Sequence, residues 1–195
     1  GLDPLRYYLV KEVSFGNDGN ISKDKLEDCI NSDLANNFGN LCQRVTAFNH
    51  KNCFSIIPKK INFNDEDLKI LDNFSNNIEN LRENIDNQNL NFYINFIIEA
   101  LFEANKYFND QEPWKKKNNI ERLETIIYTS LEIIRKICIL LFPIIPESTL
   151  KAFNIFGLNE KDIIFSTISN HEYLVKGSKI NKIEILFNKI EKNND

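Results

Sequence analysis

The sequence predicts an all-α protein, an antiparallel helical bundle that ends in an irregular C-terminal tail. Apolar residues recur every three to four positions over long windows, which is the pattern of one buried helix face. Capping residues and prolines separate these windows at intervals typical of helix bundles. Six glycines in 195 residues and an apolar content of 42% favour a packed helical core. We therefore expect one bundle-sized domain with an appendage.

The first helices are predicted from their capping signals. Asp3 followed by Pro4 is typical of a helix start, with Asp3 as the capping residue. The glycine-containing turn over 15–20 then ends this first unit. Ser22 is expected to cap the second helix. This second helix is expected to cover 22–30. A third helix, capped by Asn31 or Ser32, is expected to run to about residue 48.

Later helices have equally clear boundaries. Asn64 and Asp67 have the spacing of a capping box, and apolar residues then step by three or four as far as Ile85. Asn118 or Asn119 is expected to cap the longest helix. The remaining expected elements are helices over 88–108, 120–142 and 146–156, with Gly157 just past the end of the last one, and a tail with a short strand or an extended segment over 182–187.

Composition excludes several classes of protein. No run of about 18 apolar residues exists to span a bilayer, and the net charge of −4 argues against wholesale coating by nucleic acid. Four dispersed cysteines predict neither a metal site nor a disulfide framework, and reduced thiols fit a cytoplasmic protein. The sequence contains neither a nucleophile paired with a base nor a glycine-rich phosphate loop. It therefore predicts no catalytic or cofactor site in this chain. Because the sequence starts at Gly1 and contains no Met, we expect it to be a processed chain or an internal piece of a longer protein.

One helix pattern carries two kinds of chemistry. Its apolar face is regular, whereas its polar face is rich in amides and carries one guanidinium group. Asparagine is a poor helix former but offers a donor and an acceptor, and arginine suits phosphates and base edges. This pattern indicates local nucleic-acid binding. The apolar residues are Leu34, Phe38, Leu41, Cys42 and Val45, and the polar residues are Asn36, Asn40, Gln43 and Arg44.

The single tryptophan suggests a second binding element. Trp114 lies between Pro113 and the run Lys115, Lys116 and Lys117. An indole beside a rigid proline can stack on an unpaired base, and the lysines can meet phosphates. Two alternatives remain open from these residues alone. Trp114 could cap the bundle, and Asn40 and Arg44 could be ordinary helix surface, with Arg44 pairing Asp33 or another neighbouring carboxylate.

In order and spacing, six segments together resemble the methionyl-tRNA synthetase family. The resemblance covers nearly the whole chain, although Asn188 stands where a proline is common. The segments are Gly1-Leu2-Asp3-Pro4-Leu5-Arg6-Tyr7-Tyr8-Leu9, Phe15-Gly16-Asn17-Asp18-Gly19, residues 31–36 with Gly39-Asn40-Leu41 and Arg44, Ala104-Asn105-Lys106-Tyr107-Phe108 with Pro113-Trp114, Phe142-Pro143-Ile144-Ile145-Pro146-Glu147, and Leu186-Phe187-Asn188-Lys189-Ile190-Glu191.

The resemblance implies a class I aminoacyl-tRNA synthetase, which uses ATP with magnesium to attach methionine to initiator and elongator tRNA(Met). It implies an upstream catalytic domain, whose signature motifs are absent from this sequence. Residues 1–21 would be the end of a stem-contact region, 22–156 the helical anticodon-binding domain, and 157–195 a tail.

The resemblance also implies roles for the candidate residues. Asn40 and Arg44 would hydrogen-bond anticodon bases, and Trp114, held by Pro113, would stack beside the wobble cytosine of the CAU anticodon. Lys115, Lys116 and Lys117 would contact the RNA backbone of the anticodon stem. Two other functions stay open: the equivalent domain of a leucine or valine enzyme, and a helical protein-interaction module without an RNA role. We expect no DNA partner and no membrane contact.

Overall fold

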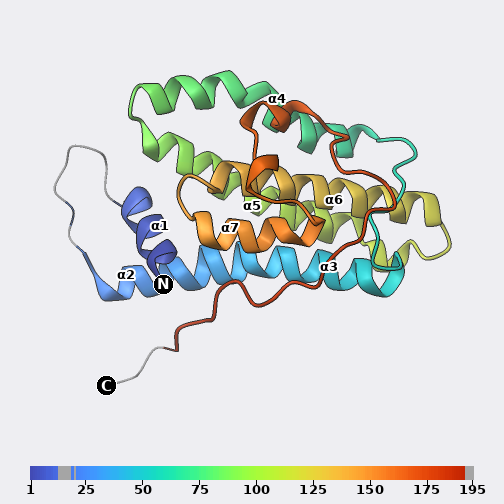
Figure 1. Ribbon diagram of the computed structural model, residues 1–195, viewed down its shortest axis with the longest axis horizontal. Helices are drawn as coiled ribbons and strands as arrows, with labels where there is room; N and C mark the ends of the chain where they lie inside the picture. The colour runs from blue at the N-terminus through green and yellow to red at the C-terminus, as the bar shows by residue number, and fades with distance from the viewer. Residues whose placement is uncertain (13–18, 20, 192–195) are drawn as a thin grey trace.

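The structure, a computed structural model, describes residues 1–12, 19 and 21–191 and forms a helical bundle around one central helix (Figure 1). That helix, α6, is buried over most of its length. Within the described residues, no helix is long and apolar enough to cross a membrane. The α-helices are α1 Leu2–Glu12, α2 Lys23–Cys29, α3 Asn40–Asn52, α4 Asp65–Asp86, α5 Leu90–Gln111, α6 Ile120–Leu141 and α7 Pro146–Phe153, with a π-helix η1 over Ile30–Gly39 and short 3₁₀ turns η2 Pro113–Lys115, η3 Asn154–Phe156, η4 Glu160–Asp162 and η5 Phe165–Ser169.

The caps that depend on neighbouring residues are confirmed. The Asn64 side chain accepts from the backbone N–H of Asp67, and the Asp67 carboxylate accepts from the backbone N–H of Asn64, both at 3.0 Å. Asn119 caps α6, where its Oδ1 accepts from the Arg122 N–H at 3.1 Å. Gly157 has a φ of +67°, as expected for the residue past a helix end. Ile85, predicted to face inward, is 38% exposed.

The predicted break at Asn31 or Ser32 is wrong, because the chain stays helical over 23–52 through a π-helical middle. Neither side chain caps a helix. The Asn31 amide instead hydrogen-bonds the backbone of Ile190 in the tail, and the Ser32 hydroxyl donates to Asp33. The predicted apolar face of this helix is confirmed. Its residues Leu34, Phe38, Leu41, Cys42 and Val45 are all buried.

Asp3 caps a different helix from the one predicted. The first helix begins at Leu2, so Asp3 lies inside it, and its Oδ2 accepts from the backbone N–H of Ser148 at 2.7 Å. Ser148 belongs to the first turn of α7, whose N–H groups lack partners within the helix. Arg6 adds hydrogen bonds to the carbonyls of Pro143 and Ile144. The first helix therefore stabilises the α6–α7 junction.

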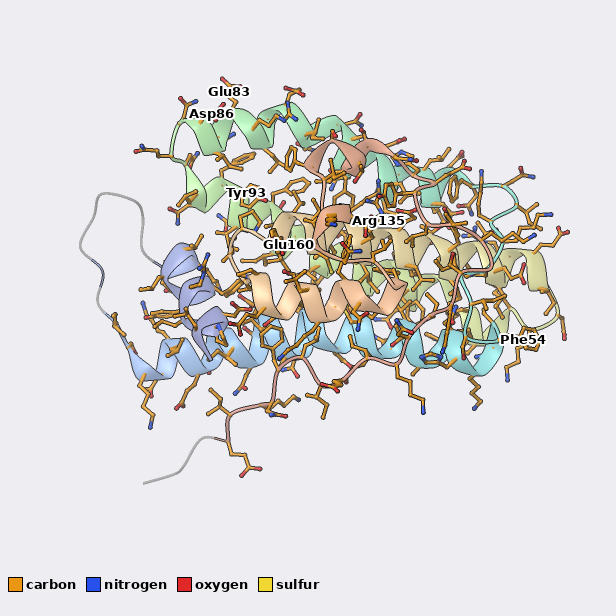
Figure 2. All side chains as sticks on the ribbon, in the orientation of Figure 1. Phe54, Glu83, Asp86, Tyr93, Arg135 and Glu160 are labelled. Carbon is orange, nitrogen blue, oxygen red and sulfur yellow. The ribbon has the colours of Figure 1, made fainter. Side chains whose placement is uncertain are left out.

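A buried polar network fixes the chain that follows the last helix. The Arg135 guanidinium donates to the Glu132 carboxylate and to the carbonyls of Thr167 and Asn170. Figure 2 labels Arg135 near the middle of the bundle. Lys136 also donates to the Asn170 carbonyl, at 2.8 Å. These contacts bind η5 and its flanks to α6, although the segment has little regular structure.

The last described residues run along the helix that contains α3 (Figure 1). Of the two forms expected for 182–187, the strand does not form, because that stretch has no strand hydrogen bonding. The tail instead contacts the loop after α3 through an isolated antiparallel bridge between Ile56 and Lys179. Further on, Ile190 pairs with Asn31 through two backbone-to-amide hydrogen bonds. The irregular tail thus packs against the bundle.

Candidate nucleic-acid interface

Asn40 and Arg44 lie one helical turn apart at the start of α3. Asn40 is the first residue of α3, directly after the π-helix, and it is exposed. Within the described residues, its side-chain amide has no hydrogen bond. A π-helical stretch is rare and often marks a functional site. The local structure therefore presents an unpaired amide to the surroundings.

Arg44 reaches from α3 to α5. Its Nη2 donates to Oδ1 of Asn109 at 2.5 Å, and its guanidinium carbon lies 5.3 Å from the centre of the Phe108 ring. A guanidinium at this distance is attracted to an aromatic face. Arg44 is half-buried, so these two contacts hold the group in place while part of it remains accessible.

Trp114 lies in the short η2 turn between α5 and α6. The turn begins at Glu112, whose φ of +44° is in the left-handed region, and Pro113 is buried beneath it. Trp114 meets the buried ring of Phe108 in a tilted edge contact, with ring centres 6.1 Å apart. The indole is nevertheless 41% exposed. Trp114 therefore packs on the bundle and still offers aromatic surface to a ligand.

Phe108 joins the predicted residues into one site. Its ring contacts Arg44 from α3 and Trp114 from η2, and Phe48 packs against it edge-on at 6.2 Å. The structure thus brings Arg44, Trp114 and Pro113 to one end of the bundle. Asn40 lies one turn before Arg44, at the start of α3. Sequence reasoning missed the linking role of Phe108, because in the sequence it is one of several apolar residues on the buried face of α5.

An ion-pair network positions the tryptophan loop. Arg122 of α6 makes two hydrogen bonds to the fully buried carboxylate of Asp67, at 2.5 and 3.0 Å. Its Nη2 also donates to Oε1 of Gln111 at 2.5 Å, and the Tyr107 hydroxyl donates to the same carboxylate. Gln111 is the last residue of α5, directly before the η2 turn. Because a two-point contact between a guanidinium and a carboxylate is rigid, it fixes the point from which the loop departs.

The three lysines after Trp114 are not equivalent. Lys115 forms an ion pair with Glu112 at 2.7 Å, whereas Lys116 is half-buried and its backbone N–H bonds the Pro113 carbonyl. Lys117 is exposed. A surface ion pair contributes little, so Lys115 can exchange Glu112 for a phosphate at small cost.

The alternative pairing of Arg44 with Asp33 is wrong. Asp33 accepts instead from the Lys11 ammonium at 2.7 Å and from the Tyr7 hydroxyl at 3.1 Å. This pairing belongs to the contact between α1 and η1. Arg44 meets a neutral amide, so its positive charge is not neutralised by a carboxylate. Such a guanidinium remains attractive to an anionic RNA.

The four cysteines are chemically quiet, including Cys42, which lies between Asn40 and Arg44 on the buried face of α3. All four are unpaired and buried. Burial raises the pKa of Cys29 and of Cys53 to about 12, and it raises the pKa of Cys42 and Cys138 as well. Thiols with raised pKa values are poor nucleophiles and poor metal ligands. In the described part of the chain, no group of three or more His, Cys, Asp or Glu residues could hold a metal ion.

Comparison with known families agrees with this geometry. Residues 1–46 match the family model of tRNA synthetases class I (M), and residues 57–195 match the model of the anticodon binding domain of methionyl tRNA ligase. The bundle thus belongs to the class I aminoacyl-tRNA synthetases, and most of it matches their anticodon binding domain. The chain belongs to the methionyl-tRNA ligase family.

Relatives from distant bacteria support the same assignment. The methionine–tRNA ligase of Mycobacterium leprae is 37% identical over 174 residues, which are 87% of this chain and 32% of that protein. That of Thermotoga maritima is 34% identical over 193 residues, or 98% of this chain and 30% of that protein. The chain therefore spans about a third of the length of these relatives.

Solved structures show the same fold. The free form of Mycobacterium tuberculosis methionyl-tRNA synthetase superposes with a TM-score of 0.92 at 30% identity, over 99% of this chain and 40% of that one. The same enzyme in complex with methionyl-adenylate superposes with a TM-score of 0.90 at 31% identity, over 96% of this chain and 37% of that one.

Proposed function

We propose that this chain recognises the CAU anticodon of tRNA(Met), in both initiator and elongator forms. Trp114, supported by Pro113, stacks on the first anticodon base. Arg44 and Asn40 hydrogen-bond the edges of unpaired bases. Unpaired RNA loops are recognised by this combination of stacking and edge contacts. Lys115, Lys116 and Lys117 then meet phosphates of the anticodon stem.

The observation that carries this proposal is the grouping of Arg44 and Trp114 around the Phe108 ring. Two side chains that are 70 residues apart in sequence converge there, and each keeps accessible surface. A tryptophan serving only to cap the bundle would be better buried, as Pro113 beside it is. The grouping therefore favours a ligand that combines an aromatic face with negative charge.

The wider activity is also part of the proposal. We infer that the chain serves an enzyme that attaches methionine to tRNA(Met) with ATP and magnesium in the cytoplasm, where free thiols persist. Residues 1–21 would connect to the catalytic domain of the same polypeptide, 22–156 would bind the anticodon, and 157–195 would form the tail. The ATP chemistry would belong to that catalytic domain.

The proposal is tested by the affinity of this chain for a stem-loop RNA with a CAU anticodon. We expect Trp114→Ala to weaken binding about 5- to 150-fold, which corresponds to about 1–3 kcal/mol for one stacked base. Phe92→Ala is a matched control, because Phe92 is a partly exposed aromatic at the opposite end of α5. Stem-loops with leucine or valine anticodons should bind more weakly than the CAU stem-loop.

Two outcomes would contradict the proposal. Equal affinity for the CAU, leucine and valine stem-loops would show that the domain does not distinguish the CAU anticodon. Unchanged RNA affinity in Trp114→Ala, with the same far-ultraviolet circular dichroism as the unmodified chain, would favour the protein-interaction module.

A further inference from the structure

A pocket lies between the helix that carries Asn40 and the C-terminal tail. It has a volume of about 290 Å³, near the lower end of roughly 300–1,000 Å³ typical of small-ligand sites. One wall comes from the π-helix and the start of α3, and the other from residues 185–189. Figure 1 shows the tail running beside this helix. The pocket is large enough for one flat ring but not for an extended ligand.

The pocket is surrounded by polar groups that lack partners. Asn36, Asn40 and Gln43 line it from the helix, and Asn188 and Lys189 line it from the tail. In the described part of the chain, none of these five side chains has a hydrogen bond or an ion pair. Four amides offer donors and acceptors together, which is what the edge of a base requires, and the ammonium group suits a phosphate.

The tail wall is firmly attached to the helix. The Asn31 amide donates to the Ile190 carbonyl at 2.9 Å and accepts from its N–H at 2.8 Å. Phe187 packs on Phe38, with ring centres 6.4 Å apart. A Cβ placed on Gly39 would lie 3.8 Å from Cδ2 of Phe187, an ordinary van der Waals distance, so Phe187 packs close to the helix at Gly39. The pocket is therefore built by specific contacts.

The pocket continues the proposed anticodon site. Asn40 lines it and lies four residues before Arg44, one turn along the same helix. Trp114 lies beyond Arg44, on the side away from the pocket, because the Phe108 ring that it contacts also packs against Phe48, one turn after Arg44 on α3. An RNA strand that crosses α3 from Trp114 past Arg44 would therefore reach the pocket next.

We propose that this pocket takes one further unpaired base of the same RNA loop, and that the tail contributes Asn188 to its edge and Lys189 to its phosphate. The inference rests on the proposed function. It assigns a binding role to tail residues and to Gln43, in addition to the Trp114 and Arg44 positions. The ligand is a nucleobase with its adjoining phosphate, recognised by side-chain amides.

The test couples protein variants to RNA variants. The unmodified chain and the double variant Gln43→Ala with Asn188→Ala are each titrated with the CAU stem-loop and with stem-loops that lack one loop base in turn. We expect one loop position, different from the one coupled to Trp114, whose base removal weakens the unmodified chain about tenfold. The same removal should barely affect the double variant. Lys189→Ala should remove about one phosphate contact. The slope of the logarithm of the binding constant against the logarithm of the salt concentration should then change by about 0.7.

Lys182→Ala is the matched control, since Lys182 is an exposed tail residue outside the pocket. This variant should still lose about tenfold in RNA affinity when the base at that loop position is removed. Identical base-removal losses in the unmodified chain and the double variant would overturn the inference while leaving the proposed function intact, provided that Trp114→Ala still weakens binding. If Trp114→Ala has no effect on RNA binding, both the proposed function and this inference fail.

Discussion

Arg44 and Asn109 are joined by a hydrogen bond of 2.5 Å between Nη2 and Oδ1, which links α3 to the last turns of α5. The contact holds the guanidinium plane beside the Phe108 ring, 5.3 Å from its centre. Since an arginine presents five N–H donors, the bond to Asn109 leaves others for a ligand. The two contacts therefore fix the position of the Arg44 guanidinium in the chain without RNA, as the proposed function requires.

Arg44→Ala should weaken binding of the CAU stem-loop by about 1–3 kcal/mol. It should also reduce discrimination against a changed base at one anticodon position. Arg44→Lys should recover some affinity through its charge but little discrimination, because an ammonium lacks the planar fork. The discrimination is measured from the affinities for three stem-loops, each with one of the three anticodon bases changed. Full discrimination by Arg44→Ala would remove Arg44 from the list of base-reading residues.

The ion pair between Arg122 and Asp67 should contribute strongly to folding. Arg122→Met leaves a fully buried carboxylate without its cation, and we expect the free energy of unfolding in urea to fall by about 3–5 kcal/mol. Lys23→Met is the control, because Lys23 is exposed and pairs with Glu27 at 3.7 Å on the same helix, so its loss should cost less than about 0.5 kcal/mol. Equal effects of the two substitutions would contradict the structural role assigned to Arg122.

Asn31→Ala should release the end of the tail. The substitution removes two hydrogen bonds to Ile190, each contributing about 1 kcal/mol. Amide hydrogen exchange at Ile190 should accelerate about 30-fold, as expected for about 2 kcal/mol. Asn77→Ala removes only side-chain bonds to Asn73 on the exposed face of α4, and it should leave exchange at Ile190 unchanged. Unaltered exchange in Asn31→Ala would mean that other contacts hold the tail.

Stability should depend on pH through a buried lysine. Burial, together with the charge of Arg135, lowers the pKa of Lys136 to about 7, whereas the unfolded chain titrates near about 10.4. Between these values the unfolded state binds more protons, so the free energy of unfolding rises with pH. Cys29 and Cys53 act oppositely, since burial raises each pKa to about 12 and unfolded thiols ionise near about 8.5.

We therefore expect stability to rise from pH 7 to about 8.5 and to fall at higher pH. Urea unfolding in the presence of a reductant measures the profile. Lys136→Met should lower overall stability and abolish the rise, since it removes the titrating amine. A rise of the same slope in Lys136→Met would show that another group is responsible.

Sequence reasoning predicted the features that depend on near neighbours. The capping box of Asn64 and Asp67 is complete within four residues, and the buried stripe from Leu34 to Val45 lies on one helix. Asp3 and Asn31 were misassigned because their partners are Ser148 and Ile190, which are 145 and 159 residues away. Local capping rules cannot indicate that such a side chain serves a distant backbone.

In the candidate site too, residues marked by local sequence could be predicted, whereas residues that depend on distant packing could not. Trp114 and Arg44 stand out by residue type, so local pattern was enough to mark them as candidates, whereas their roles in binding came from the family resemblance. Phe108 looks like any buried aromatic until the fold places it between them. Lys189 and Asn188 belong to an irregular tail without periodicity, so only the packing of that tail against η1 and α3 reveals that they line a pocket.

The most direct measurement is a fluorescence titration of Trp114, the single tryptophan, with the CAU stem-loop. A base stacked on the exposed indole should quench its emission, and the quenching should saturate at the affinity measured independently by RNA binding. Removing the first anticodon base should abolish most of the quenching. Unchanged emission at saturating RNA would contradict the central claim that Trp114 stacks on the anticodon.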